Sequence, residues 1–184
     1  MTSRKSIRRQ GGFTLVELLI VAILLAILAA IVVPQFASTT TEAQESALRA
    51  NLAAMRSAID LYRQQHGEYP ATLASSGGAC TTGIGTGGLG TQVALEDQLT
   101  RYTNQAGGSC ALQEAGYAYG PYIKEDVLPV NPITQNGTFA IVNTGNLDMT
   151  ADGAALGYKY DTTSGKIIAN DTNLDSAGVA YSTY

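Results

Sequence analysis

Few residues in this chain have side chains that could carry out chemistry, and they do not form a catalytic set. The single histidine, His66, stands between two glutamines and Gly67, which is typical of a helix end where a cation or a polar cap suffices. No Ser/His/Asp or Cys/His arrangement can be built around it. The glycine-rich stretch 83–90 has no lysine and is not a phosphate-binding loop. The sequence therefore predicts that the protein is not an enzyme.

Glu17 is the most unusual acidic residue, because it lies in an apolar run. From Phe13 to Val33 only Thr14 and Glu17 are not apolar. A helix of that length reaches about 30 Å, the thickness of the hydrocarbon core of a bilayer. A carboxylate in such a segment is by default functional and needs a partner. The alternative is that Glu17, one turn into the helix, is solvated near the head groups.

Acidic residues near the end of the chain suggest a calcium site. The run 171–175 resembles the start of a calcium loop, and residues 148–152 form a second acidic loop that could approach it. An EF-hand would require a glutamate where Ser182 stands, so this type of site is excluded. The alternative is a solvated acidic turn. The candidate calcium ligands are Asp148, Asp152, Asp171, Asn173 and Asp175.

The two cysteines, Cys80 and Cys110, enclose a polar loop. In an exported protein they could form a disulfide, which would stabilise the fold by roughly 3–4 kcal/mol in the chain-entropy model. Two isolated cysteines and one distant histidine offer no zinc-type ligand cluster.

Charge is distributed unevenly about the apolar run. Four of the 11 Lys and Arg residues (Arg4, Lys5, Arg8 and Arg9) precede it, whereas all 15 Asp and Glu residues follow Gly12. A basic flank stays on the cytoplasmic side, so we expect the bulk of the chain to face outward. Its acidity argues against nucleic acid as a partner.

A long helix is expected to carry the apolar run into the rest of the chain. It should continue past Pro34 with a bend and stop at Gly67. Its second part has one apolar stripe, which either covers a small sheet or forms a coiled-coil seam. The stripe consists of Leu48, Leu52, Met55, Ile59 and Tyr62.

The middle of the chain is poor in core residues. Ser75–Thr91 is rich in Gly, Ser and Thr and is expected to be an irregular loop. Leu95, Leu99 and Tyr102 have helical spacing, which predicts a short helix that ends within 104–107. Two prolines make Tyr117–Pro132 an extended or edge segment.

Strands are predicted late in the chain. Residues 138–142 are rich in strand-forming side chains, and 157–161 and 166–170 flank a four-residue connection that ends in Gly165. The fold class is therefore α+β, with a long N-terminal helix packed on a small antiparallel sheet.

The run Gly12-Phe13-Thr14-Leu15-Val16-Glu17, followed by an apolar helix and Pro34, resembles the signal of type IV pilins and type II secretion pseudopilins. The resemblance implies cleavage between Gly12 and Phe13 by a prepilin peptidase and N-methylation of Phe13. It implies that Glu17 acts in assembly, paired with the α-amine of Phe13 in a neighbouring subunit or in its own chain. Pro34 would be the helix-bending proline of the family.

The head is similar to major pseudopilins over two segments. Tyr62 with Gly67-Glu68-Tyr69-Pro70 resembles their helix-ending segment, and Tyr122-Ile123-Lys124 with Leu128–Pro132 resembles their "Tyr…Leu-Pro-x-Asp-Pro" segment. The chain departs from that pattern with Asn131 for the aspartate, Ile133-Thr134 for Trp-Gly, and cysteines in mid-chain. Calcium in the C-terminal loops of major pseudopilins adds to the case for the calcium ligands named above.

The resemblance implies a basic leader at 1–12 that is removed, a transmembrane and polymerisation helix at 13–36, an amphipathic continuation at 37–66 and an exported head at 67–184. The protein would be a pseudopilin, held in the inner membrane with its head in the periplasm and then polymerised. The alternatives are a major or minor type IV pilin in surface fibres and, from another class, a minor subunit whose head binds a ligand. Expected partners are its own copies, other pseudopilins or minor pilins, the prepilin peptidase and the inner-membrane assembly platform.

Overall fold

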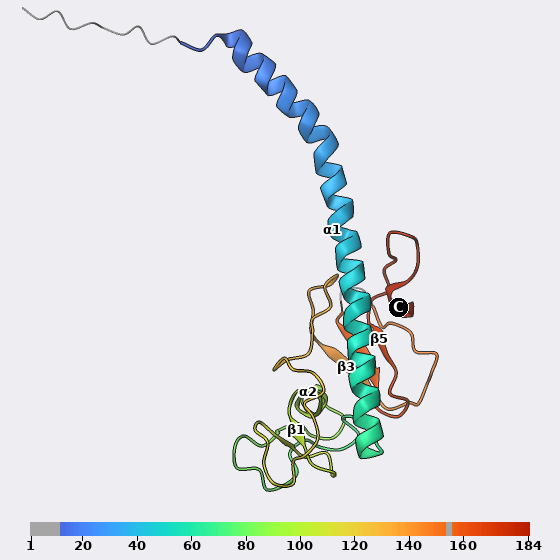
Figure 1. Cartoon of the computed structure of the whole chain (residues 1–184). Coiled ribbons are helices and arrows are strands. Elements are labelled where there is room, and N and C mark those ends of the chain that lie inside the picture. Colours follow the sequence, from blue (N-terminus) through green and yellow to red (C-terminus); the bar gives the residue numbers. More distant parts are fainter. Residues whose placement is uncertain (1–11, 154–155) are drawn as a thin grey trace, which may run out of the picture. The chain divides into compact units, whose positions relative to one another are not determined.

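The computed structural model describes residues 12–153 and 156–184. The chain divides into two units, Met1–Thr40 and Thr41–Tyr184. The basic leader, apart from Gly12, lies outside the described residues. One helix, α1 (Leu15–His66), contributes residues to both units (Figure 1), and each unit is considered separately below.

The first unit consists mainly of the N-terminal part of α1. Its segment Leu15–Val33 is long and apolar enough to cross a membrane, and none of it is buried. Every large apolar side chain of this segment faces the surroundings, with exposed fractions between 41% and 81%. The helix runs through Pro34 without interruption. A helix that is apolar all round requires an apolar partner, either lipid or other helices.

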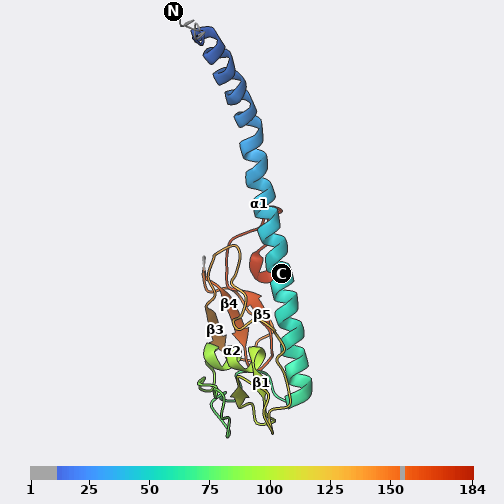
Figure 2. The ribbon, with the colours of Figure 1, turned by 60° about the vertical axis from the view of Figure 1, so that its left-hand side comes forward.

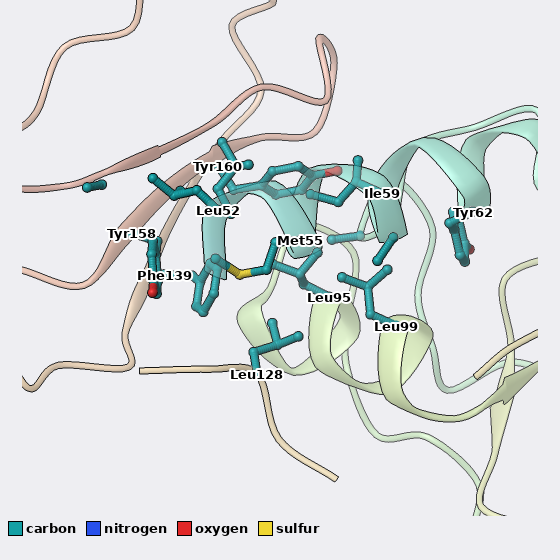
Figure 3. Packing of buried hydrophobic residues seen from close by; sticks show 14 of the residues in the cluster. Leu52, Met55, Ile59, Tyr62, Leu95, Leu99, Leu128, Phe139, Tyr158 and Tyr160 are labelled. Carbon is teal, nitrogen blue, oxygen red and sulfur yellow. The ribbon is translucent and has the colours of Figure 1, made fainter. Parts of the chain in front are cut away.

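The second unit is built on the C-terminal part of α1. Each of the five stripe residues is at most 1% exposed, and they belong to the same buried cluster as Tyr158, Tyr160 and Ile167. Figures 2 and 3 show the strands and α2 (Gln92–Thr100) lying against this part of α1. The stripe therefore covers a sheet, and the coiled-coil alternative is wrong for these residues.

The main sheet has the order β3 (Phe139–Val142), β4 (Tyr158–Asp161) and β5 (Ile167–Ala169). β4 and β5 form the predicted antiparallel hairpin, with Tyr160 opposite Ile167. β3 instead pairs in parallel with β4, with Phe139 opposite Tyr158, so the expected antiparallel sheet is mixed. The connection 143–157 is long enough for the crossover that parallel neighbours require.

A second, two-stranded sheet changes the expected end of the short helix. α2 ends at Thr100, because Arg101 is extended and the next residues form β1 (Tyr102–Thr103). β1 pairs with β2 (Ser109–Cys110), and the Thr103 N–H donates to the Tyr119 carbonyl at 2.9 Å. These non-local hydrogen bonds override the helical spacing of Tyr102. The last element is a short 3₁₀ helix, η1 (Tyr181–Thr183).

The end of α1 is joined to the β4–β5 hairpin through Tyr69. Gly67 follows the helix with φ of +80°, and Gly165 closes the hairpin turn with φ of +73°. A Cβ on Gly165 would lie 2.1 Å from the Tyr69 ring, so only glycine fits beneath that ring. Arg63 stacks on the ring, with its guanidinium carbon 4.1 Å from the centroid. The helix-ending segment thus positions the hairpin.

The stripe predicts a large stability difference between two leucines of α1. Leu52→Ala, at a fully buried position, should lower the free energy of unfolding by about 2–5 kcal/mol. Leu61→Ala, at a position 44% exposed, should change it by less than about 1 kcal/mol. Urea denaturation of the full chain in detergent, followed by tyrosine near-UV circular dichroism, measures both. Equal losses would contradict the packing described above.

Candidate functional site

Glu17 is held by a hydrogen-bonded cap at the start of α1. Its Oε2 accepts from the backbone N–H and the hydroxyl of Thr14, both at 2.8 Å. In return, the Thr14 Oγ1 accepts from the Glu17 N–H at 3.2 Å. This is a capping box, which satisfies N–H groups that have no partner within the helix. The spacing Thr14-x-x-Glu17 carries its sequence signature, so the role of Thr14, which sequence reasoning missed, could have been found.

The two residues at the expected processing site lie just before this cap. Gly12, Phe13 and Thr14 precede the first residue of α1 and have no regular structure. Phe13 is 81% exposed, and a Cβ built on Gly12 would meet no atom within 4 Å. An exposed Gly-Phe bond outside any helix or strand is accessible to a protease, and cleavage there would place a new α-amine one residue before the Thr14–Glu17 cap. Cleavage, methylation and the assembly roles of Glu17 and Pro34 remain predictions.

Cys80 and Cys110 form a disulfide, with 2.02 Å between the sulfur atoms and 5.6 Å between the Cα atoms. It joins the Ser75–Thr91 loop to β2. Glu114 lies beside it and accepts hydrogen bonds from the hydroxyls of Thr81 and Thr82. In the described part of the chain, this is the one group of three His, Cys, Asp or Glu side chains whose ligand atoms lie within 4.8 Å. Because both sulfur atoms are in the disulfide, the group offers no thiolate to a metal.

The candidate calcium ligands already make hydrogen bonds or ion pairs within the chain, some more than others. Asp175 is buried: its Oδ1 accepts from the N–H groups of Ala177 and Val179, and its Oδ2 from Arg49 and Tyr184. Asp171 is fully buried and accepts from the Asn173 N–H at 2.9 Å.

The second acidic loop is engaged elsewhere. Asp152 forms an ion pair with Lys159 and accepts a hydrogen bond from the Asn170 side chain. The hydrogen bond from Lys159 is the main cause that lowers the pKa of Asp152. Asp148 is exposed, with its backbone N–H bonded to the Asn146 side chain at 2.8 Å.

These side chains do not fit a calcium ion as they are placed. Calcium takes six to eight oxygen ligands at about 2.3–2.6 Å. No three carboxylates of the described residues come within 4.8 Å of one another. One atom of the set, Oδ2 of Asp171, is buried without a hydrogen-bond partner. A single free oxygen is far fewer than the cage requires, and calcium binding remains a prediction.

Comparison with known proteins places these features in a family. The family "Prokaryotic N-terminal methylation motif" matches residues 7–33, which include Gly12, Phe13 and Glu17. A fimbrial protein of Neisseria meningitidis serogroup B is 30% identical over 163 residues, which cover 83% of this chain and 89% of that protein. A serogroup A fimbrial protein is 32% identical over 158 residues. The chain belongs to the superfamily of type IV pilins and type II secretion pseudopilins.

The secretion proteins match a shorter part. Type II secretion system core protein G of Pseudomonas aeruginosa is 40% identical over 65 residues, 35% of this chain, and that of Aeromonas hydrophila is 37% identical over the same length. The match covers 46% of each of these relatives, so the chain spans about half their length. No solved structure matches.

Within this pilin-like chain, Asn131 has a structural role that explains its departure from the usual aspartate. It is fully buried, and its side-chain oxygen accepts from the N–H groups of Ile133 and Thr134. Its side-chain nitrogen donates to the Gly157 carbonyl at 3.1 Å, just before β4. A carboxylate could make the first two hydrogen bonds but not the third, because it has no hydrogen to donate when ionised.

Two buried polar residues of α2, which sequence reasoning missed, bond to the loops on either side of the helix. Asp97 accepts from the Ser75 hydroxyl at 2.6 Å and the Thr86 N–H at 2.9 Å, and it pairs with Arg101. Gln98 accepts from the Ala71 N–H and donates to the carbonyls of Leu73 and Gly107. Their positions on α2 carry no sequence signal that separates them from surface residues.

His66 lies at the end of α1, as its position predicts, but it is buried in the head and does more than cap the helix. It is 8% exposed and stacks on Tyr62 with 4.0 Å between ring centroids. Its Nε2 lies 3.0 Å from the hydroxyl oxygens of both Thr103 and Tyr122. Burial lowers the pKa of His66, and a hydrogen bond with the Gln105 backbone partly opposes this shift. The neutral ring is therefore the form that the fold prefers.

This preference predicts a pH dependence of stability. Above the ordinary histidine pKa of about 6.5, His66 is neutral in both the folded and the unfolded chain and costs nothing. As the pH falls below that value, the unfolded chain binds a proton before the folded one, so stability falls. Because the pKa values of Asp152 and Asp175 are lowered from their ordinary acid range, they do not titrate in this window.

The thermal midpoint of the full chain in detergent should fall by a few degrees between about pH 7 and about pH 5. His66→Gln, which cannot titrate, should show a flatter profile over the same range, whatever its stability. Parallel profiles for the two proteins would show that other groups control this pH range.

Proposed function

We propose that the chain is a structural subunit of a pilus-like filament, a pseudopilin of type II secretion. In this proposal it is inserted once in the inner membrane with its head in the periplasm. Prepilin peptidase cleaves it between Gly12 and Phe13 and methylates Phe13, and the chain then polymerises through its N-terminal helix. Its partners are its own copies, other pseudopilins or minor pilins and the assembly platform of the inner membrane. It has no enzymatic activity and no nucleic-acid ligand of its own.

The observation that carries this proposal is the unburied apolar segment Leu15–Val33, which has a single carboxylate near its start and follows an accessible Gly-Phe bond. Such a segment can exchange contacts with lipid for contacts with neighbouring helices at little cost in apolar exposure. Glu17 then requires a compensating charge, because a carboxylate in an apolar environment is unfavourable unless it is paired. In a filament the α-amine of Phe13 from a neighbouring subunit supplies it.

A type IV pilin in surface fibres is the second candidate. It is favoured by the match to the fimbrial proteins, which extends over 83% of the chain, whereas the match to the secretion proteins covers 35%. The length and location of the fibres that contain this chain distinguish the two systems. Long surface fibres containing the native chain would support the pilin, and short periplasmic ones would support the pseudopilin.

The processing step is tested on the mature N-terminus. Mass spectrometry of the assembled protein should find a chain that begins with methylated Phe13. Gly12→Leu should block cleavage, because a bulky side chain replaces the glycine that precedes the cut bond, whereas Gly11→Ala should be processed. An intact Met1 on the assembled protein would refute the processing site.

The assembly role is tested on Glu17. Glu17→Val should leave membrane insertion intact and abolish filaments, because the apolar side chain removes the charge that pairs with the amine. Glu42→Val is the matched control, since Glu42 is an exposed glutamate of α1 outside the apolar segment, and it should assemble normally. Membrane fractionation and electron microscopy of sheared fibres give the two readouts. Normal filaments from Glu17→Val would contradict the pairing.

A further inference from the structure

The C-terminal loop 171–184 is attached to α1 by charged and polar side chains. Glu45 of α1 is 5% exposed and accepts from the backbone N–H of Ser176 at 2.9 Å and its hydroxyl at 3.0 Å. The Tyr181 hydroxyl also donates to Oε1 of Glu45 at 3.5 Å. Asp171 and Asp175 are buried in the same loop, and they and Glu45 raise the pKa of Tyr181 after the larger effect of burial.

Arg49, on the next turn of α1, forms an ion pair with one of these acids, Asp175. Its Nη2 lies 3.2 Å from Oδ2 of Asp175, whose side chain is 1% exposed, while the side chain of Arg49 is 55% exposed. The guanidinium carbon also lies 4.1 Å from the ring centroid of Tyr184, and Nη2 donates to the Tyr184 hydroxyl at 2.7 Å. The arginine covers the carboxylate from the solvent side, and the tyrosine ring orients its plane.

Tyr184 completes the contact. Its hydroxyl donates to Oδ2 of Asp175, and burial with this contact raises its pKa to about 12, so the proton stays in place at neutral pH. The backbone oxygen of Tyr184 accepts from Arg56, which also donates to the Ile167 carbonyl at 3.0 Å. The loop is therefore fastened to α1 at Glu45, Arg49 and Arg56.

We propose that Arg49 is the counter-ion of this loop and takes the place that a calcium ion would hold at Asp175, so that the head closes its C-terminal loop without calcium. Each carboxylate oxygen of Asp175 already accepts two hydrogen bonds from the chain itself, Oδ1 from the loop backbone and Oδ2 from Arg49 and Tyr184. A guanidinium offers the positive charge that a divalent cation would bring, and it is covalently fixed to α1. The proposal concerns the folding of the head and holds whether the filament is a pseudopilus or a pilus.

The test is the thermal unfolding of the full chain in detergent, with either a calcium chelator or calcium chloride. The wild-type midpoint should be the same in both. Arg49→Gln should lower the midpoint by roughly 3–8 °C. It should also speed the cleavage of residues 171–184 by a protease that does not cut at arginine, so that loss of the arginine does not itself remove a cleavage site. Arg49→Lys, which keeps the charge, should recover part of the loss. The matched control is Arg63→Gln, which removes an arginine that also stacks on a tyrosine, at the far end of the helix.

Each result decides the proposal. A wild-type midpoint that falls on chelation would overturn it, since calcium would then be the counter-ion. It would also be overturned if Arg49→Gln unfolded and released the loop no more readily than Arg63→Gln. Should Arg49→Gln fail to fold, the wild-type comparison with chelator still tests the proposal, and Arg49→Lys with a wild-type midpoint supports it.

Discussion

The core of the head depends on α1, which contributes one of its two sides. Five of its largest fully buried side chains, Leu48, Leu52, Met55, Ile59 and Tyr62, come from this helix. The strands they cover are two to four residues long and would not be stable as sheets alone. The same helix, without a break, carries the exposed apolar segment at its other end. One continuous element therefore serves both the folding of the head and the contacts of the N-terminal unit.

The helix and the hairpin could be predicted from the sequence because their causes are local. The stripe has helical periodicity, Gly67 supplies a left-handed residue at the helix end, and Gly165 closes a turn between two strand-like runs. The parallel pairing of β3 could not be predicted, since it depends on how the connection 143–157 crosses the head. The helical spacing of Tyr102 predicts a helix, but its backbone pairs with Cys110, a partner that the local sequence does not reveal.

The polar core was the part least visible in the sequence. A head with short strands has many backbone groups outside any ladder, and buried ones must find other partners. Asp97, Gln98 and Asn131 provide them, each bonding to backbone groups of more than one residue. Asp, Asn and Gln are also common on protein surfaces, so the residue type alone does not show that these side chains are buried. The N-terminal motif was easier to recognise, because Gly12, Phe13 and Glu17 lie close together in the sequence, and the family model matches the segment that contains them.

The match to the secretion proteins is confined to about a third of the chain, whereas that to the fimbrial proteins extends over most of it. The part that the chain shares with both groups is the N-terminal motif and helix, so the difference between the two groups lies in the head. In that head, the C-terminal loop is bonded to Glu45, Arg49 and Arg56 of α1. With Arg49 as the proposed counter-ion, the conformation of the loop would not depend on the calcium concentration. Salt would screen this pair less than a fully exposed one, because its carboxylate is buried while its guanidinium is half-exposed.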